Sequence, residues 1–122
     1  MATLSVIVCT HNRCEKLARS LDAIGAATAP AGVDVEIVVV DNNSRDATPR
    51  VVEAFAGRSP APVRYAFEAA QGLSYARNRG VREARGSVFA NTDDDCVVDP
   101  DWLVEIWREF ETHRDVGIVG GR

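Results

Sequence analysis

Short runs of apolar, mostly β-branched residues alternate along this chain with segments whose apolar residues recur at helical spacing. This alternation limits the fold more than any other feature of the sequence. The run Asp34–Val40 is almost continuously apolar, which is typical of a parallel strand covered on both faces. Strands that alternate with helices at this pace favour parallel pairing with right-handed crossovers. The sequence therefore predicts an α/β fold, a Rossmann-like and mostly parallel sheet flanked by helices.

The expected elements are placed by their apolar patterns and by proline and glycine signals. We expect strands at Leu4–Cys9, Asp34–Val40, Val63–Phe67, Ser87–Asn91 and Val116–Val119. We expect helices through Leu17–Ile24, from Thr48-Pro49 to Gly57, over Leu73–Ala84 and from Pro100 onward. A chain of 122 residues that is 46% hydrophobic fits one domain, residues 1–122. Because nothing follows the last expected strand to cover it, we expect this domain to be truncated at its C-terminal end and open to self-association there.

Charge and cysteine usage exclude several classes of protein. A formal net charge of −4 argues against a protein whose main partner is DNA or RNA. No apolar segment has the length of a membrane span, and the first run lacks the basic flank and length of a signal peptide. Cys9, Cys14 and Cys96 cannot all pair and show no zinc-ligand spacing, which favours reduced thiols. We therefore expect a cytoplasmic protein without a membrane span.

Polar residues follow three of the expected strands, at Thr10–Arg13, Asp41–Ser44 and Asp93–Asp95. Because the carboxyl ends of parallel strands meet at one edge of a sheet, we expect these groups to converge in one crevice. Three adjacent carboxylates repel one another, and a cation would relieve that repulsion. Oxygen ligands of this kind suit Mg²⁺ or Mn²⁺. The alternative is an exposed acidic turn that water solvates.

Four blocks carry a resemblance to a known family. The chain has neither G-x-G-x-x-G nor G-x-x-x-x-G-K-[ST], which disfavours a dinucleotide or P-loop site. In order, it contains SVIVCTHNR, EIVVVDNNSRDAT, QGLSYARNRGVREARG and ANTDDDCVVDPDWL. Together these blocks resemble glycosyltransferase family 2 over essentially the whole chain. The resemblance implies the GT-A fold and an inverting transfer of sugar from a nucleotide-diphosphate donor, with a UDP-sugar favoured and the acceptor unknown.

The resemblance also implies roles for individual residues. It places Thr10, His11 and Asn12 against the nucleotide base, and Asp41 as an acceptor for the uracil ring. It places Arg77 near the donor nucleotide, Asp93 or Asp94 at the ribose, and the D-x-D carboxylates Asp93 and Asp95 on a Mn²⁺ or Mg²⁺ cation. Residue chemistry leaves two alternatives open: Asn12 could cap the following helix, and Asp41 could shape an Asx turn.

The family's catalytic base and acceptor surface lie in its second half, so we expect the base beyond the end of this chain and assign no catalytic residue. One alternative is therefore a truncated, non-catalytic half-domain that binds nucleotide and metal. A sugar-phosphate nucleotidyltransferase ranks last, because CTHNRCEK does not supply the glycine-rich loop that such an enzyme would need. The spacing of Trp102 and Trp107 with Ile106 and Phe110 favours core packing over a sugar platform.

Overall fold

The computed structural model describes residues 2–112, which form alternating strands and helices as the sequence predicts. In chain order the elements are β1 (Ala2–Thr10), α1 (Cys14–Ala26), β2 (Val33–Asp41), α2 (Thr48–Ala56), β3 (Val63–Phe67), α3 (Leu73–Glu83), β4 (Val88–Asp93) and α4 (Trp102–Thr112). None of these described helices is both long and apolar enough to cross a membrane. The fifth strand expected at Val116–Val119, and the self-association expected there, lie outside the described residues.

The described strands form one parallel sheet in the order β3-β2-β1-β4. Its register brings the carboxyl ends of the strands together. Thr10 pairs with Asp41, Cys9 pairs with Asp93, and Asp41 also pairs with Phe67. The α/β class and the parallel sheet are therefore confirmed, and the polar residues that follow the strands share one edge.

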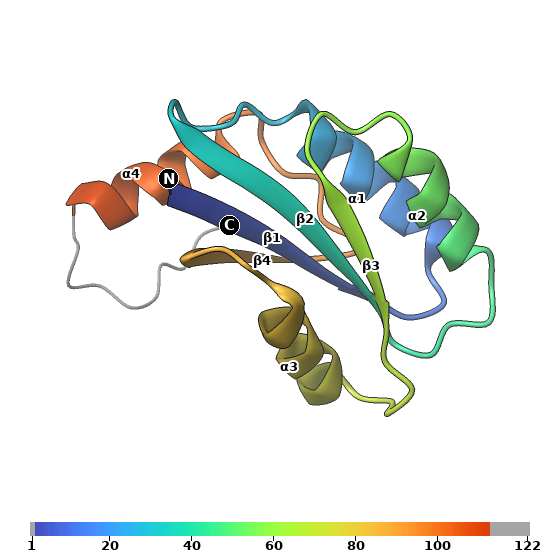
Figure 1. The fold of residues 1–122 in the computed structure, drawn as a ribbon. Helices are drawn as coiled ribbons and strands as arrows, with labels where there is room; N and C mark the ends of the chain where they lie inside the picture. The colour runs from blue at the N-terminus through green and yellow to red at the C-terminus, as the bar shows by residue number, and fades with distance from the viewer. Residues whose placement is uncertain (1, 113–122) are drawn as a thin grey trace.

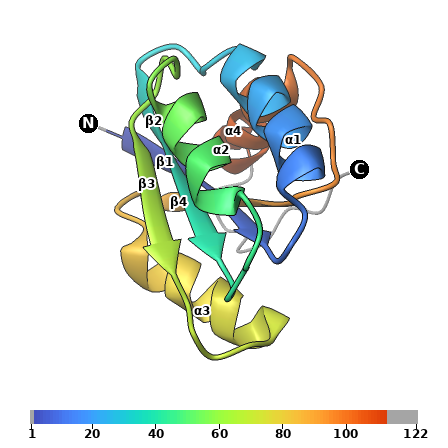
Figure 2. The ribbon, with the colours of Figure 1, turned by 90° about the vertical axis from the view of Figure 1, so that its right-hand side faces the viewer.

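Helices cover both faces of the sheet (Figures 1 and 2). On one face, α1, α2 and α4 lie over the larger apolar core. Its buried members are Leu4, Val6, Val8, Leu17, Leu21, Ile24, Ile37, Val39, Val52, Phe55, Ala90 and Leu103. Trp102 and Trp107 are partly buried and pack against this core, as their spacing predicts, and Trp102 also lines a cavity at the edge of the sheet. On the other face, within the described residues, α3 packs against Ile7, Val38 and Val40 through Ala76.

Glycine allows α3 to lie close to the sheet. A Cβ atom placed on Gly80 would come within 2.5 Å of the Ile7 Cγ2 atom, so only glycine fits this contact without a shift. At the start of the helix, Gly72 has a φ of +142°, which side chains other than hydrogen rarely permit. Gly80 is therefore required by a close approach to the sheet, and Gly72 by its backbone conformation.

Most element boundaries differ from the expectations by a few residues, and two of these differences lie close to the polar edge or change a helix start. The expected strand at Ser87–Asn91 extends to Asp93, so the first aspartate belongs to the strand itself. The last helix begins at Trp102 and not at Pro100. The reason lies in the Pro100 carbonyl, which accepts a hydrogen bond of 2.9 Å from the Thr28 N–H and so joins a tertiary contact instead of starting the helix.

Candidate functional site

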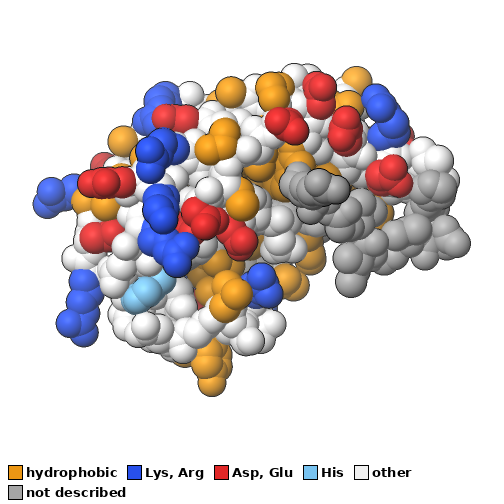
Figure 3. Space-filling view, turned by 180° about the vertical axis from the view of Figure 1, so that it is seen from behind, with side chains coloured by type: hydrophobic (Ala, Val, Ile, Leu, Met, Phe, Trp, Pro, Cys, Tyr) orange, Lys and Arg blue, Asp and Glu red, His pale blue; other side chains and the backbone are white. Residues whose placement is uncertain are grey.

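A cavity of about 410 Å³ opens at the carboxyl edge, between α3 and the end of β4. Arg77 from α3 and Asp93 from β4 both line it, together with apolar side chains that include Ile7 and Trp102. Arg77 therefore reaches this cavity, and its place near a donor nucleotide stays a prediction. Figure 3 shows carboxylate and basic side chains grouped on this side of the molecule, beside exposed apolar surface. This edge can meet a ligand that has charged and apolar parts.

The cavity also contains a thiol, at Cys9. Burial raises the pKa of Cys9 to about 11, an effect larger than the opposing attraction of the Arg77 guanidinium. The thiol is therefore neutral near pH 7 and a poor nucleophile. The Cys9 side chain therefore forms part of the cavity wall, and we assign it no role as a nucleophile.

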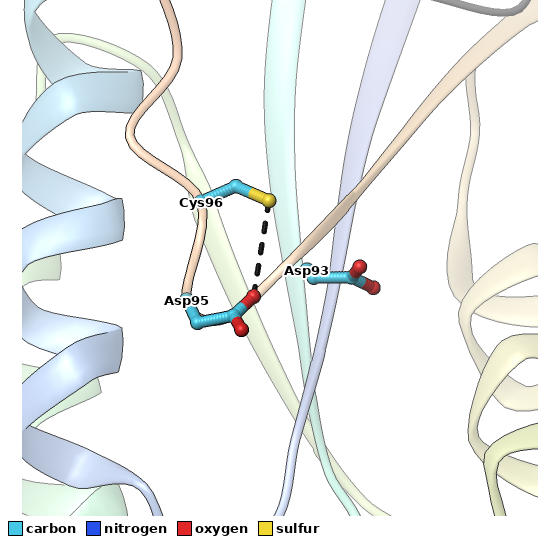
Figure 4. A group of neighbouring side chains, drawn as sticks. All are labelled: Asp93, Asp95 and Cys96. Atoms are coloured by element: carbon cyan, nitrogen blue, oxygen red, sulfur yellow. Dashed lines mark hydrogen bonds between the residues drawn. The ribbon is translucent and has the colours of Figure 1, made fainter. Parts of the chain in front are cut away.

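Asp93, Asp95 and Cys96 form an exposed cluster at the end of β4. One potential ligand atom of each lies within 4.8 Å of those of the other two. Figure 4 shows the Cys96 thiol directed at Asp95, a contact of 3.8 Å, with Asp93 beside them. Two carboxylates at this spacing fit Mg²⁺ or Mn²⁺, because both cations prefer oxygen ligands. The sequence singled out Asp93 and Asp95 as metal ligands but missed Cys96, although it directly follows the acidic triplet.

Asp94 points away from this cluster and is buried. It accepts a hydrogen bond of 2.8 Å from the Thr10 hydroxyl and a longer one of 3.4 Å from the Arg13 guanidinium. Asp94 and Asp95 lie in the turn after β4, which the Cys96 N–H closes by donating to the Asp93 carbonyl at 3.3 Å, so adjacent carboxylates point in different directions. Nucleotide contacts of Thr10 and Asp94 stay predictions, while their visible role is to join β1 to the end of β4.

Asp41 is fully buried and both of its carboxylate oxygens have partners. One accepts the Ser44 N–H at 2.9 Å, and the other accepts the Tyr65 hydroxyl at 2.6 Å. Burial, followed by the hydrogen bond to Asp41, raises the pKa of Tyr65, so the phenol stays a donor. The turn-shaping alternative for Asp41 is therefore present in the structure. Its contact with a nucleotide base stays a prediction.

The loop after β1 is tied to the loop after β2. Asn12, with a φ of +51°, accepts a hydrogen bond of 2.7 Å from the Arg45 N–H, and its own N–H donates to Ser44 at 2.8 Å. Asn12 therefore does not cap α1. Instead the Asp46 carboxylate accepts the Cys14 N–H at 3.0 Å, across the two loops.

Hydrogen bonds also set the charge of this cap. Burial alone would raise the pKa of Asp46, but hydrogen bonds from Thr48 and Cys14 outweigh it and lower the pKa to about 2. Asp46 is consequently ionised at neutral pH, which suits its place at the start of α1. Sequence reasoning missed Asp46 because its partner lies 32 residues away.

His11 turns its ring toward β2. Its Nδ1 atom lies 2.6 Å from the Asn42 carbonyl oxygen. Because a carbonyl can only accept, Nδ1 is the donor in this bond. His11 and Asn12, which the sequence predicts to lie against the nucleotide base, directly follow β1. They therefore lie at the same edge of the sheet as Arg77 and Asp93. The sequence analysis did not single out Asn42, whose carbonyl oxygen accepts this bond from His11.

Fold and site together define a class of protein. An open parallel α/β sheet has clustered carboxylates and an arginine at its carboxyl edge, where such sheets bind phosphorylated ligands. Comparison with protein families gives a match to Glycosyl transferase family 2 over residues 5–122. The chain belongs to this family.

Individual relatives agree with this assignment. The chain is 30% identical to glucosyl-dolichyl phosphate glucuronosyltransferase of Haloferax volcanii over 120 residues. This aligned segment covers 97% of this chain and 37% of the relative. Among solved structures it is similar to S. aureus TarS in complex with UDP-GlcNAc, with a TM-score of 0.81 and 25% identity over 93% of this chain and 32% of that one.

A second structural relative is the mannosyltransferase PcManGT from Pyrobaculum calidifontis, in complex with GDP-Man and Mn²⁺. Its TM-score is 0.80 at 30% identity, over 88% of this chain and 32% of that one. The chain thus spans about a third of the length of the curated relatives it matches. These likenesses confirm the GT-A fold that the sequence predicted.

Proposed function

We propose that this domain binds a nucleotide-diphosphate sugar together with Mn²⁺ or Mg²⁺, as the donor-binding part of an inverting glycosyltransferase. One observation carries the proposal: Asp93 and Asp95 lie together at the end of β4, and Asp93 shares a cavity with Arg77. Carboxylates that hold a cation and an arginine that meets phosphate are complementary to the charges of a diphosphate.

The relatives support this proposal through their bound ligands. TarS binds UDP-GlcNAc, and PcManGT binds GDP-Man with Mn²⁺. Between these donors we favour a UDP-sugar, as the family resemblance implies, with Asp41 as the acceptor for the uracil imide N–H. A rearrangement of the Tyr65 hydroxyl would free one carboxylate oxygen for that contact.

The side chains of the site have separate tasks in this proposal. Asp93 and Asp95 would hold the cation, which supplies charge neutralisation as the diphosphate leaves. The Arg77 guanidinium donates to phosphate oxygens from the opposite wall. The Arg13 guanidinium, whose Nη1 atom lies 3.8 Å from an Asp95 oxygen, offsets part of the acidic charge of the cluster. His11 presents an aromatic face that can stack on a base.

A binding module without turnover is the second candidate. We assign none of the described residues as the catalytic base, and transfer also needs a surface for the acceptor. The chain spans 32% to 37% of the length of the relatives compared above, which favours donor binding as the activity of these residues. Both candidates share the donor site, so binding is the property to test first.

Isothermal titration calorimetry with UDP, with and without Mn²⁺, tests the proposal. We expect UDP binding that depends on Mn²⁺ and is lost in Asp95→Ala. The matched control is Asp34→Ala, an exposed aspartate near the amino end of β2, which should bind like the wild type. Absence of UDP binding by folded wild-type protein, or equal binding by Asp95→Ala, would overturn the proposed site.

A further inference from the structure

Asn42 follows the last residue of β2 and is almost fully buried, with 5% of its surface exposed. Its side-chain amide donates to two carbonyl oxygens, those of Glu68 at 3.1 Å and Ala70 at 2.8 Å. Its Oδ1 atom accepts the Gly72 N–H at 2.9 Å. The reverse amide orientation would place Oδ1 against two carbonyls, so the partners fix the side chain in one orientation. A single side chain thus holds three points of the loop between β3 and α3.

The backbone of the same residue holds the loop after β1. The Asn42 N–H donates to the Thr10 carbonyl at 2.8 Å, and the Asn42 carbonyl accepts from His11 Nδ1. With its hydrogen on Nδ1, the neutral imidazole leaves Nε2 as an acceptor. The amides of Asn12 and Gln71 both lie 3.3 Å from Nε2, and Gln71 belongs to the loop that Asn42 holds. The two loops therefore meet at His11.

The third connection runs to α3. Gly72 precedes the first residue of the helix, and its carbonyl accepts the Ala76 N–H at 3.1 Å, which is the first bond of the helix. Arg77 follows one residue later, and its side chain lines the cavity with Asp93. Because Gly80 is fitted closely against Ile7, α3 has little freedom to slide. The Asn42–Gly72 bond thus fixes the residue that precedes the helix, while the packing of Gly80 on Ile7 fixes the helix beyond Arg77.

We propose that Asn42 is a positioning residue of the donor site, which fixes His11 and the start of α3 as one unit. It touches neither the proposed cation ligands nor the cavity, so it acts through these two neighbours. The inference rests on the proposed function, since it assigns both neighbours to nucleotide binding. A purely structural role would lower stability but leave the nucleotide affinity of the folded protein unchanged.

The test compares Asn42→Ala and Asn42→Asp with the control Asn78→Ala, which changes an exposed asparagine of α3. The first variant removes all three side-chain bonds. The second keeps an acceptor for Gly72 but sets a carboxylate against two carbonyls. At a temperature where every variant is folded, we expect the affinity for UDP with Mn²⁺ to fall about tenfold or more in both Asn42 variants, corresponding to about 1.4 kcal/mol. Binding of Mn²⁺ alone should be unchanged, because Asp93 ends β4, Asp95 lies in the turn that follows it, and Asn42 has no hydrogen bond to either.

Amide hydrogen exchange without nucleotide gives an independent readout. We expect the Gly72 amide to exchange faster in Asn42→Ala than in the wild type and in Asn78→Ala. Equal exchange would overturn the inference, as would unchanged UDP affinity or an equal loss of Mn²⁺ affinity. If the wild type bound no UDP, the proposed function would fail, and the exchange data would separately show whether Asn42 fixes the loop.

Discussion

Asp94 illustrates how three consecutive carboxylates take different roles. Asp93 and Asp95 are exposed at the cavity side, while Asp94 is 5% exposed and bonded to Thr10 and Arg13. A buried carboxylate is tolerated only with hydrogen bonds and charge partners. Thr10 supplies the shorter of its two bonds and should therefore matter for stability.

We predict that Thr10→Val destabilises the protein by about 1–3 kcal/mol, because it leaves a buried acceptor without its nearest donor. Denaturation by urea, followed by circular dichroism, measures this difference. Thr28→Val is the matched control, since Thr28 is exposed, and should change the free energy of unfolding by less than about 0.5 kcal/mol. Equal effects of the two variants would contradict the role given to Thr10.

The sequence predicted the acidic site but not which of its three carboxylates is buried and which two are exposed. Asp94 lies in the turn after β4, and its partners Thr10 and Arg13 stand more than 80 positions earlier in the chain. The partners of Asp41 and Asp46 come from contacts between loops distant in sequence, such as Tyr65 and Cys14. No local pattern encodes such contacts, so the structure was needed to find them.

At the scale of elements, the contact between α3 and β1 sets one wall of the cavity. We predict that Gly80→Ala destabilises the protein by about 1–3 kcal/mol, since its Cβ would lie 2.5 Å from a buried Ile7 atom. This range is the net loss, after the gain of about 1 kcal/mol in helix propensity. The displaced helix should also weaken UDP binding, because it carries Arg77.

The control for this prediction is Gly57→Ala. A Cβ at Gly57 would come no closer than 3.6 Å to the Ala54 carbonyl oxygen, and its backbone is right-handed helical. The change should be neutral or stabilise by about 0.4–1 kcal/mol. Urea denaturation of both variants decides the matter, and comparable losses in the two would refute the close-packing argument.

A buried polar cluster connects three strands with the end of α3. The Glu36 carboxylate of β2 accepts bonds from the Ser5 hydroxyl of β1 at 2.5 Å, the Arg85 N–H at 2.6 Å and the Arg64 guanidinium of β3 at 2.8 Å. Burial alone would raise the pKa of Glu36, but these donors and charges outweigh it and lower the pKa below its ordinary value of 4.5.

A lowered pKa in the folded state means that the ionised carboxylate stabilises the fold above pH 4.5 and that this contribution is lost as the pH falls through the folded-state pKa. We predict that Glu36→Gln is less stable than the wild type by about 1.5–3 kcal/mol at pH 7. The deficit should shrink below pH 4.5. Urea denaturation at pH 7, 5, 4 and 3 measures it, with the exposed Glu53→Gln as control. A deficit independent of pH would contradict the prediction.

Element boundaries were less predictable than the elements. The expected strands and helices within residues 2–112 all appear, because apolar period and glycine signals are local properties. The helix α4 begins at Trp102 and not at the expected Pro100. The Pro100 carbonyl instead accepts a hydrogen bond from the Thr28 N–H, 72 positions earlier in the chain. Such tertiary bonds override local helix signals.

For the whole molecule, parallel topology brings the expected site to one edge. His11 and Asn12, Asp41 and Asn42, Arg77, and Asp93 and Asp95 all lie at or beyond the carboxyl ends of the strands. The sequence predicted this convergence from the parallel pairing of the strands, and the family match confirms the fold behind it. Specific nucleotide contacts and the cytoplasmic location stay predictions.

The most direct measurement of the central claim is an amide chemical-shift map of the ¹⁵N-labelled chain, titrated with UDP and Mg²⁺. The account predicts shifts confined to the carboxyl edge, over residues 10–13, 41–44, 71–77 and 93–96, with none near Asp34 at the amino end of β2. Shifts at the amino edge, or a spectrum of folded protein that UDP and Mg²⁺ leave unchanged, would contradict it.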